Sequence, residues 1–197
     1  LIRRQRQMCI RDRAGDKFNV GQDQKPPTIL VNTNFNYANN LVSVEEMAKR
    51  YPVKGESFTL SYFYDRREYQ QRIMNQMIEL VDALGTQYPS VPILLRPHPT
   101  ENVDFYHDRL KQHPNVGVSC QGSVHEAIAT ASILIHHDCT TGIEGTVHGL
   151  PVISFQPEFD PVYAQHFPAR LGQRTTSVNE TIQLVAKLLE NKNAMHQ

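Results

Sequence analysis

Short apolar runs alternate with amphipathic stretches from residue 28 to the end of the chain. Five runs rich in valine, isoleucine and leucine predict buried strands, because they are apolar throughout rather than at every second position. These runs cover residues 28–32, 91–95, 116–119, 132–136 and 151–155. Strands that alternate with helices are typical of βαβ units. We therefore expect an α/β fold, a Rossmann-like parallel sheet of about five strands with helices on both faces.

Stretches with an apolar residue at every third or fourth position predict the helices. The longest is expected over residues 66–84, with Gly85 just past its end, and it carries on one face Tyr69, Ile73, Met77, Leu80 and Leu84. Other helices are expected over residues 102–112, 123–130, 141–148 and 178–190, and residues 44–51 have a weaker helical pattern. Capping boxes, in which Ser or Thr is followed three residues later by Glu, begin at Ser123, Thr141 and Ser177.

The composition argues against several classes of protein. The 197 residues carry 20 basic and 20 acidic side chains, which argues against a dedicated nucleic-acid-binding protein with its basic surface. The three cysteines, at positions 9, 120 and 139, have no C-x-x-C spacing, so neither a disulfide scaffold nor a cysteine-rich zinc site is indicated. No stretch approaches the roughly 18 apolar residues of a membrane span, and no signal-peptide pattern is recognisable. We expect reduced thiols and a cytoplasmic protein.

Residues 1–13, LIRRQRQMCIRDR, differ from the rest of the chain. They hold five arginines and one aspartate with no usable period, which as a native segment would be a flexible basic arm. The string is also similar to translated sequencing-adapter sequence, so we leave it out of the fold prediction. Without it the chain has 15 basic and 19 acidic residues and is mildly acidic.

Polar segments follow the predicted strands at their carboxyl ends, whereas plain turn residues precede the strands. In chain order these segments begin at Asn32, Arg96, Cys120, His136 and Gln156. Ligands of open parallel sheets bind outside the carboxyl ends of the strands. The pattern therefore predicts a binding site at this edge of the sheet without naming its ligand.

The segment Arg96-Pro97-His98-Pro99 follows the second strand. Each proline pushes the residue before it toward extended geometry, so this strand exit is stiff and can point a guanidinium and an imidazole outward. Such a pair suits a phosphate or a diphosphate. The alternative is a turn with a solvated arginine and a structural histidine.

The segment from Thr140 to Glu144, TTGIE, begins a helix directly after the fourth strand. Two hydroxyls, free backbone N–H groups and the positive helix end would bind an anion, and Gly142 would let another group approach closely. The competing interpretation is an ordinary helix cap, because Thr141 and Glu144 have capping-box spacing.

The run His136-His137-Asp138-Cys139 suggests a metal site. However, consecutive residues at a strand end point in alternating directions, and no second cluster has metal-site spacing, so a structural role is the stronger interpretation. We expect neither a metal nor a cofactor. The chain also lacks a G-x-S-x-G elbow, a G-x-G-x-x-G loop after the first strand and a Walker A motif, which argues against a Ser-His-Asp hydrolase and the common nucleotide loops.

Four segments together resemble bacterial surface carbohydrate biosynthesis proteins. They are residues 29–35 (ILVNTNF), 94–99 (LLRPHP), 133–144 (ILIHHDCTTGIE) and 149–155 (GLPVISF). These proteins are GT-B-type enzymes related to capsule polysaccharide transferases, CDP-glycerol glycerophosphotransferases and polysialyltransferases. The resemblance covers about residues 28–190 and is to the carboxyl-terminal, donor-nucleotide-binding half of the two-domain fold.

The resemblance implies a transferase that moves a sugar or a polyol phosphate from a nucleotide-activated donor to a surface polysaccharide. It implies seven substrate-binding residues: phosphate contacts by Arg96, His98, Thr140, Thr141 and Gly142, ribose contacts by Glu144, and a substrate contact by Asn34. The paired hydroxyls are Thr-Thr here and Ser-Ser in related enzymes, a departure that keeps the chemistry.

The amino-terminal half of the GT-B fold, which usually supplies acceptor contacts and often the general base, is not recognisable in the sequence. We expect residues 1–27 to be non-native or disordered, and residues 28–197 to form one donor-binding domain that is inactive alone. The implied partners are the donor and a glycan or lipid-linked acceptor, with peripheral membrane association through the missing region left open. Two alternatives remain: an enzyme like the UDP-N-acetylglucosamine 2-epimerases, or a non-catalytic nucleotide-binding module.

Overall fold

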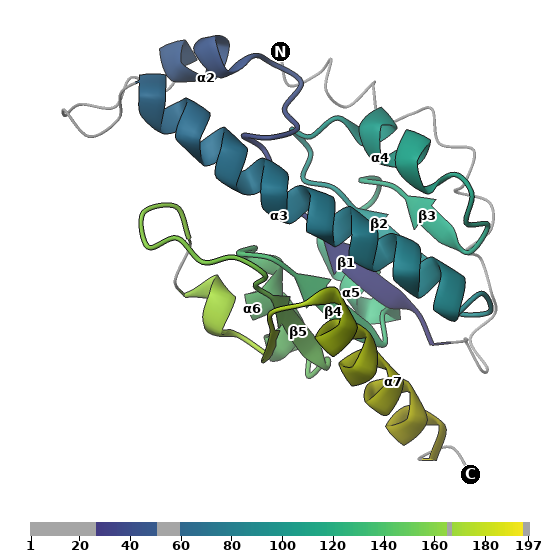
Figure 1. Cartoon of the computed structure of the whole chain (residues 1–197). Helices are drawn as coiled ribbons and strands as arrows, with labels where there is room; N and C mark the ends of the chain where they lie inside the picture. The colour runs from purple at the N-terminus through teal and green to yellow at the C-terminus, as the bar shows by residue number, and fades with distance from the viewer. Residues whose placement is uncertain (1–26, 51–59, 165–166, 195–197) are drawn as a thin grey trace.

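A single parallel sheet organises the protein. The computed structural model describes residues 27–50, 60–164 and 167–194, and Figure 1 shows a central sheet with helices on both faces. Six strands form the sheet, all parallel, in the order β3-β2-β1-β4-β5-β6. They are β1 (Ile29–Asn32), β2 (Ile93–Arg96), β3 (Val116–Val118), β4 (Ile133–His136), β5 (Val152–Phe155) and β6 (Gln173–Thr175). The predicted Rossmann-like α/β fold is confirmed.

The helices form two layers over this sheet. The described residues include α2 (Val44–Arg50), α3 (Leu60–Gln87), α4 (Val103–Leu110), α5 (Val124–Thr130), α6 (Thr141–Val147), the short 3₁₀ helix η3 (Pro168–Arg170) and α7 (Val178–Ala194). Helices α3, α4 and α7 pack on one face, and α5 and α6 cover the other (Figure 1).

Alternate strand residues supply the core on each face. On the α3 side the strand residues Ile29, Val31, Ile93, Ile135 and Phe155 pack against buried residues of α3, α4 and α7. A smaller cluster on the other face joins Leu30, Leu134 and Val152 to Ile128 of α5. Since the central strands are buried on both faces, their sequence is apolar without interruption.

The sixth strand was not expected from the sequence. Gln173 and Arg174 of β6 are exposed, and only Thr175 is buried. Its sequence, Gln-Arg-Thr, holds no apolar residue, so β6 lacks the apolar run by which the other strands are recognised, including β3 at the opposite edge.

The prediction that Gly85 ends the long helix is wrong. Helix α3 continues to Gln87, and Gly85 is buried within its last turn. A Cβ atom on Gly85 would lie 2.8 Å from Cγ of His113, whose Nε2 is 2.7 Å from Oδ1 of Asp82. Glycine is needed here for the close approach of an imidazole ring rather than for a helix end.

The three predicted capping boxes have different outcomes. Ser123 is confirmed: its hydroxyl accepts from the N–H of Glu126, and the Glu126 carboxylate accepts from the N–H of Ser123. The hydroxyl of Ser177 caps α7, but the carboxylate of Glu180 accepts from Thr176 instead. The capping box at Thr141 is wrong, because Thr141 is the first residue of α6 and Thr140 is at the N-cap, with no side-chain cap bond.

The first helix residues and the amino-terminal segment complete the comparison. The long helix, expected over residues 66–84, begins earlier than predicted, because α3 already covers Leu60. The segment assigned to residues 1–27 lies outside the described residues except for Pro27.

Candidate functional site

The order of the strands reverses between β1 and β4. The chain runs from β1 through β2 to β3 on one side, then returns to β4 and continues through β5 to β6 on the other. In register, Asn32 at the end of β1 pairs with Arg96 of β2 and with His136 of β4. Ligands of doubly wound sheets bind at the carboxyl ends of the strands beside such a switch point. The predicted polar segments therefore meet at the edge where a ligand is expected.

The two predicted phosphate ligands after β2 differ in what they contact. The Arg96 guanidinium donates to the carbonyl oxygens of Gln121 and Gly122, at 2.7 Å for Gly122, and so holds the loop between β3 and α5. His98 is partly buried, and its Nδ1 accepts from the N–H of Thr100 at 3.3 Å. Burial lowers the pKa of His98, which favours the neutral ring. Nδ1 also lies 2.8 Å from the Thr100 hydroxyl, so this atom is engaged within the turn in either tautomer. Nε2 is the ring nitrogen that remains for a ligand, and it donates in the tautomer in which Nδ1 accepts.

A buried carboxylate holds His98 in place. Oε1 of Glu101 accepts from the Thr33 hydroxyl and from the His98 N–H, both at 2.9 Å, and Oε2 accepts from the Tyr106 hydroxyl. Glu101 is 2 % exposed, and its burial raises its pKa. This side chain therefore joins the exits of β1 and β2.

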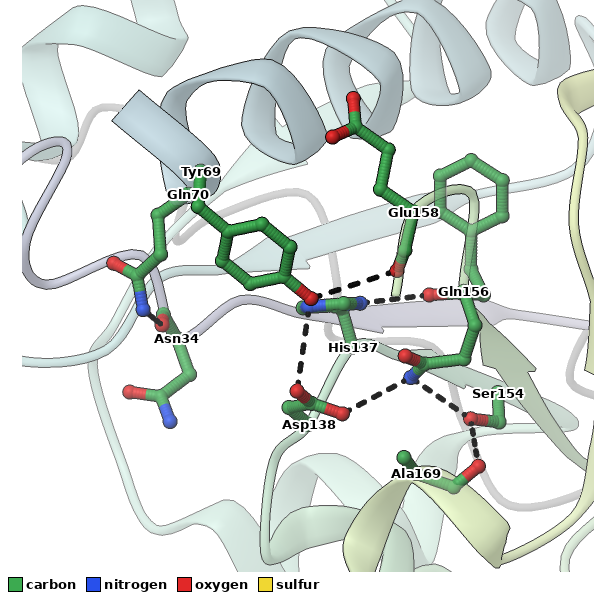
Figure 2. Close-up of polar contacts among 10 residues, drawn as sticks. Asn34, Tyr69, Gln70, His137, Asp138, Ser154, Gln156, Glu158 and Ala169 are labelled. Atoms are coloured by element: carbon green, nitrogen blue, oxygen red, sulfur yellow. Dashed lines mark hydrogen bonds and ion pairs between the residues drawn. The ribbon is translucent and has the colours of Figure 1, made fainter. Parts of the chain in front are cut away.

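The β4 exit is a tight, buried turn. Asp138 has a φ of 47°, which among non-glycine residues is most often tolerated by Asn and Asp. Nδ1 of His137 donates to the Phe155 carbonyl at 2.9 Å, and Nε2 lies 3.6 Å from Oδ2 of Asp138. Gln156 donates through Nε2 to Asp138 Oδ1 at 3.2 Å and to the Ser154 hydroxyl at 3.1 Å. Figure 2 shows this network between the ends of β4 and β5.

The two threonines after this turn lie in different surroundings. Thr140 is exposed, and its hydroxyl makes no helix-cap bond. Thr141 is 5 % exposed, and its Oγ1 accepts from Nδ2 of Asn32 at 3.2 Å and lies 2.9 Å from Sγ of Cys139. Burial also raises the pKa of the Cys139 thiol.

The start of α6 is less open to an anion than the sequence predicts. The N–H groups of residues 142 and 143 donate to the carbonyls of Cys139 and Thr140, at 3.0 and 2.9 Å, so the predicted row of free backbone donors is wrong. The group that approaches Gly142 is His136, because a Cβ atom there would lie 2.4 Å from the Nε2 of that ring. A phosphate contact at this turn therefore depends on side chains.

Glu144 and Asn34 lie at the margins of this edge. Oε2 of Glu144 is 3.8 Å from Nδ1 of His125 on α5 and has no hydrogen-bond partner in the described part of the chain. The backbone oxygen of Asn34 accepts from Gln70 of α3 at 3.2 Å, and Figure 2 shows the Asn34 side chain pointing away from that helix.

Glu101 was not predicted as a site residue from the sequence. Gln156 was predicted only as the start of a polar segment, without a role. Glu101 follows the Arg-Pro-His-Pro segment by two residues, but only its contact with Thr33, 68 residues away, marks it as buried. Neither residue belongs to a local pattern that could have identified it.

The described residues offer neither a cluster of metal ligands nor a membrane-spanning helix. Within residues 27–50, 60–164 and 167–194, no three His, Cys, Asp or Glu side chains are grouped so that they could hold one metal ion. None of the helices in these ranges is long and apolar enough to cross a membrane.

Comparison with known proteins does not assign the chain to a family. No family model matches, and neither does any curated protein sequence. Among solved structures, the glycotransferase of kitacinnamycin matches with 16 % identity and a TM-score of 0.43, over 89 % of this chain and 39 % of that one. KpsC of Thermosulfurimonas dismutans, a β-Kdo 2,4-transferase, matches with 16 % identity and a TM-score of 0.35, over 81 % of this chain and 45 % of that one.

A different kind of protein is equally similar. The Moco carrier protein of Chlamydomonas reinhardtii matches with 14 % identity and a TM-score of 0.46, over 85 % of this chain and 99 % of that one. Glycosyltransferases are thus among the structural neighbours, and the chain spans less than half of their length. Likenesses of this strength do not identify an activity.

Proposed function

We propose that this chain is the donor-nucleotide-binding domain of a transferase that moves a sugar or a polyol phosphate to a surface polysaccharide. One observation carries the proposal: His98 and Thr140 stand on the two sides of β1 at the switch point of the sheet. The resemblance of residues 28–190 to the donor half of GT-B enzymes supports it.

The spacing of these groups suits a diphosphate better than a single phosphate. Neighbouring strands lie about 4.8 Å apart, so the exits of β2 and β4 are about 10 Å apart across β1. His98 would donate from Nε2 to one phosphate and Thr140 from its hydroxyl to the other. Thr141 and Gly142 would support this turn, with Asn34 between the two sides and Glu144 toward the ribose. Arg96 would shape the neighbouring loop and add positive charge to it.

A second candidate, a module that binds the donor without turnover, is favoured by the state of the carboxylates. Transfer to a hydroxyl needs a general base. Glu101 and Asp138 are both buried and hydrogen-bonded, and Glu158 is paired with Arg72 at 2.9 Å. Among the described residues at this edge, none of these three is placed to take a proton from an acceptor.

Binding of UDP and CDP, measured by isothermal titration calorimetry, tests the proposal. His98→Ala and Thr140→Val should each weaken binding by about tenfold or more, since a hydrogen bond to a charged group contributes roughly 1.5–3 kcal/mol. Ser123→Ala is the matched control, because it removes the α5 cap and leaves the switch point intact. Affinity that is unchanged in both site variants would contradict the assignment.

Incubation with nucleotide-activated donors and a glycan acceptor separates the candidates. Glycan extension supports a transferase, epimer formation an epimerase, and binding without turnover the module.

A further inference from the structure

A pocket opens near the carboxyl ends of β5 and β6, away from the switch point between β1 and β4. It has a volume of about 420 Å³ and is lined by Gln156, Phe159, Ala169, Arg170 and Arg174. Small-molecule sites commonly have volumes of about 300–1,000 Å³. The pocket lies beyond the exit of β5, between η3 and β6. Of its lining residues only Gln156 also supports the Asp138 turn, and none is a proposed donor-binding residue.

We propose that this pocket binds a sugar that carries an oxyanion, either a carboxylate or a phosphate. The two guanidinium groups, from Arg170 and Arg174, would bind the anion, and the exposed ring of Phe159 would contact the apolar face of the sugar. That the ligand is a sugar rests on the proposed transferase function, whereas the anion site does not.

The charges in the pocket are unmatched within the described part of the chain. The Arg170 backbone N–H donates to the Phe167 carbonyl at 3.2 Å, but neither the Arg170 nor the Arg174 guanidinium forms an ion pair or a hydrogen bond with a described residue. Two carboxylates nevertheless belong to the adjoining loop. Glu158 is paired with Arg72 of α3 at 2.9 Å, and Asp160 accepts from the N–H of Val162 at 2.8 Å. Two guanidinium groups from residues that line one pocket, without a carboxylate partner among the described residues, suit an oxyanion, because their planar N–H donors match its geometry.

Hydrogen bonds from buried side chains of β4 and β5 hold the segment that carries Arg170. The Ser154 hydroxyl donates to the carbonyl of Ala169 at 2.8 Å, and it accepts in turn from Gln156. Nε2 of the fully buried His136 donates to the carbonyl of Leu171 at 3.4 Å. These two bonds hold η3 and the residue that follows it, on either side of Arg170, and Figure 2 shows the first of them.

A glycine completes the turn. Gly172 has a φ of 85°, and a Cβ atom there would lie 2.3 Å from the carbonyl oxygen of Val152. Only glycine permits this conformation at this distance. The turn therefore packs tightly on β5, and Arg174 lies in register with Ser154. Binding to a site that is already ordered loses little conformational entropy.

The expectation that the ligand is an anionic sugar rests on the two positive charges together with the aromatic ring of Phe159. Phe159 is 54 % exposed and lines the pocket, so it offers an aromatic face beside the two cations. A bare inorganic anion would use the guanidinium groups alone. A neutral sugar would use the ring alone. An anionic sugar uses both.

The test measures the affinity of the full chain for four probes: glucuronate, glucose 6-phosphate, glucose and inorganic phosphate. Titration calorimetry should give an affinity for glucuronate or glucose 6-phosphate about tenfold or more above that for glucose. Whichever of the two binds more tightly identifies the oxyanion. If neither exceeds glucose, or if inorganic phosphate equals both, the proposal is overturned.

Variants locate the binding. The double variant Arg170→Gln/Arg174→Gln should lose the preference for the anionic sugars, and Phe159→Ala should weaken the sugars but not inorganic phosphate. Lys187→Gln on α7 is the matched control, because it removes an exposed positive charge elsewhere. Thermal melts should be unchanged in the double variant, since both arginines are exposed.

The two proposals fail separately. UDP affinity should fall in His98→Ala and stay unchanged in the arginine double variant, while glucuronate affinity shows the opposite pattern. If the double variant binds anionic sugars as tightly as the unmodified chain, this pocket is not their site, whatever the outcome for UDP.

Discussion

Replacing Gly142 by alanine tests why glycine stands in the first turn of α6. The new Cβ atom would lie 2.4 Å from Nε2 and 2.5 Å from Cε1 of His136. This ring is fully buried and bonded to the Leu171 carbonyl, so it has little room to move. Overpacking of this kind costs about 1–3 kcal/mol, whereas alanine gains at most about 1 kcal/mol over glycine within a helix. We therefore expect the free energy of unfolding to fall by about 1–2 kcal/mol.

Urea unfolding followed by circular dichroism measures the change, and a second background supplies the control. In His136→Ala the clash is absent, so Gly142→Ala should be neutral or slightly stabilising there. The two substitutions should thus couple by about 1 kcal/mol or more. Equal costs in both backgrounds would refute the packing explanation. Glycine would then serve another purpose, such as the close approach of a ligand.

Two further predictions concern buried groups that titrate. Burial raises the pKa of Glu101, so the folded state holds its proton more tightly than the unfolded state, and this residue makes stability fall as pH rises above about 4.5. Glu101→Gln should remove that part of the pH dependence in urea unfolding, and Glu101→Ala should cost about 3 kcal/mol by leaving three donors without an acceptor. Burial lowers the pKa of His136 to about 4, so stability should fall by up to about 3 kcal/mol as pH drops from 6.5 toward 4. His136→Gln should flatten that fall, and an unchanged slope would contradict it.

The strands were predictable because their environment is uniform. Each strand from β1 to β5 lies in a parallel sheet covered by helices, so its residues read as a short apolar run. The edge strand β6 has one neighbour, β5, and two exposed polar residues, and its sequence resembles a loop. Sequence analysis therefore identified the strands that form the core and missed the one that carries Arg174.

The sequence predicted that the polar segments gather at one edge of the sheet, but not how they contact one another. Parallel strands align their carboxyl ends, so the segments that follow them lie at the same edge. The capping pattern at Thr141 was misleading, because the helix that follows the tight turn at Asp138 has Thr140 at its N-cap and Thr141 within its first turn. That turn depends on Gln156, which is 18 residues away, so no local pattern could have revealed it.

The adjacent residues Thr140 and Thr141 show most clearly why the environment of a side chain cannot be predicted from the local sequence. They are identical in sequence, yet the hydroxyl of Thr141 is engaged by Asn32, 109 residues away, while Thr140 is exposed. The same division holds across the whole edge. Its buried polar groups hold loops to one another, and a ligand can reach only the groups that this network leaves exposed. Binding at this edge should therefore depend on few side chains, each supported by a buried partner that does not itself touch the ligand.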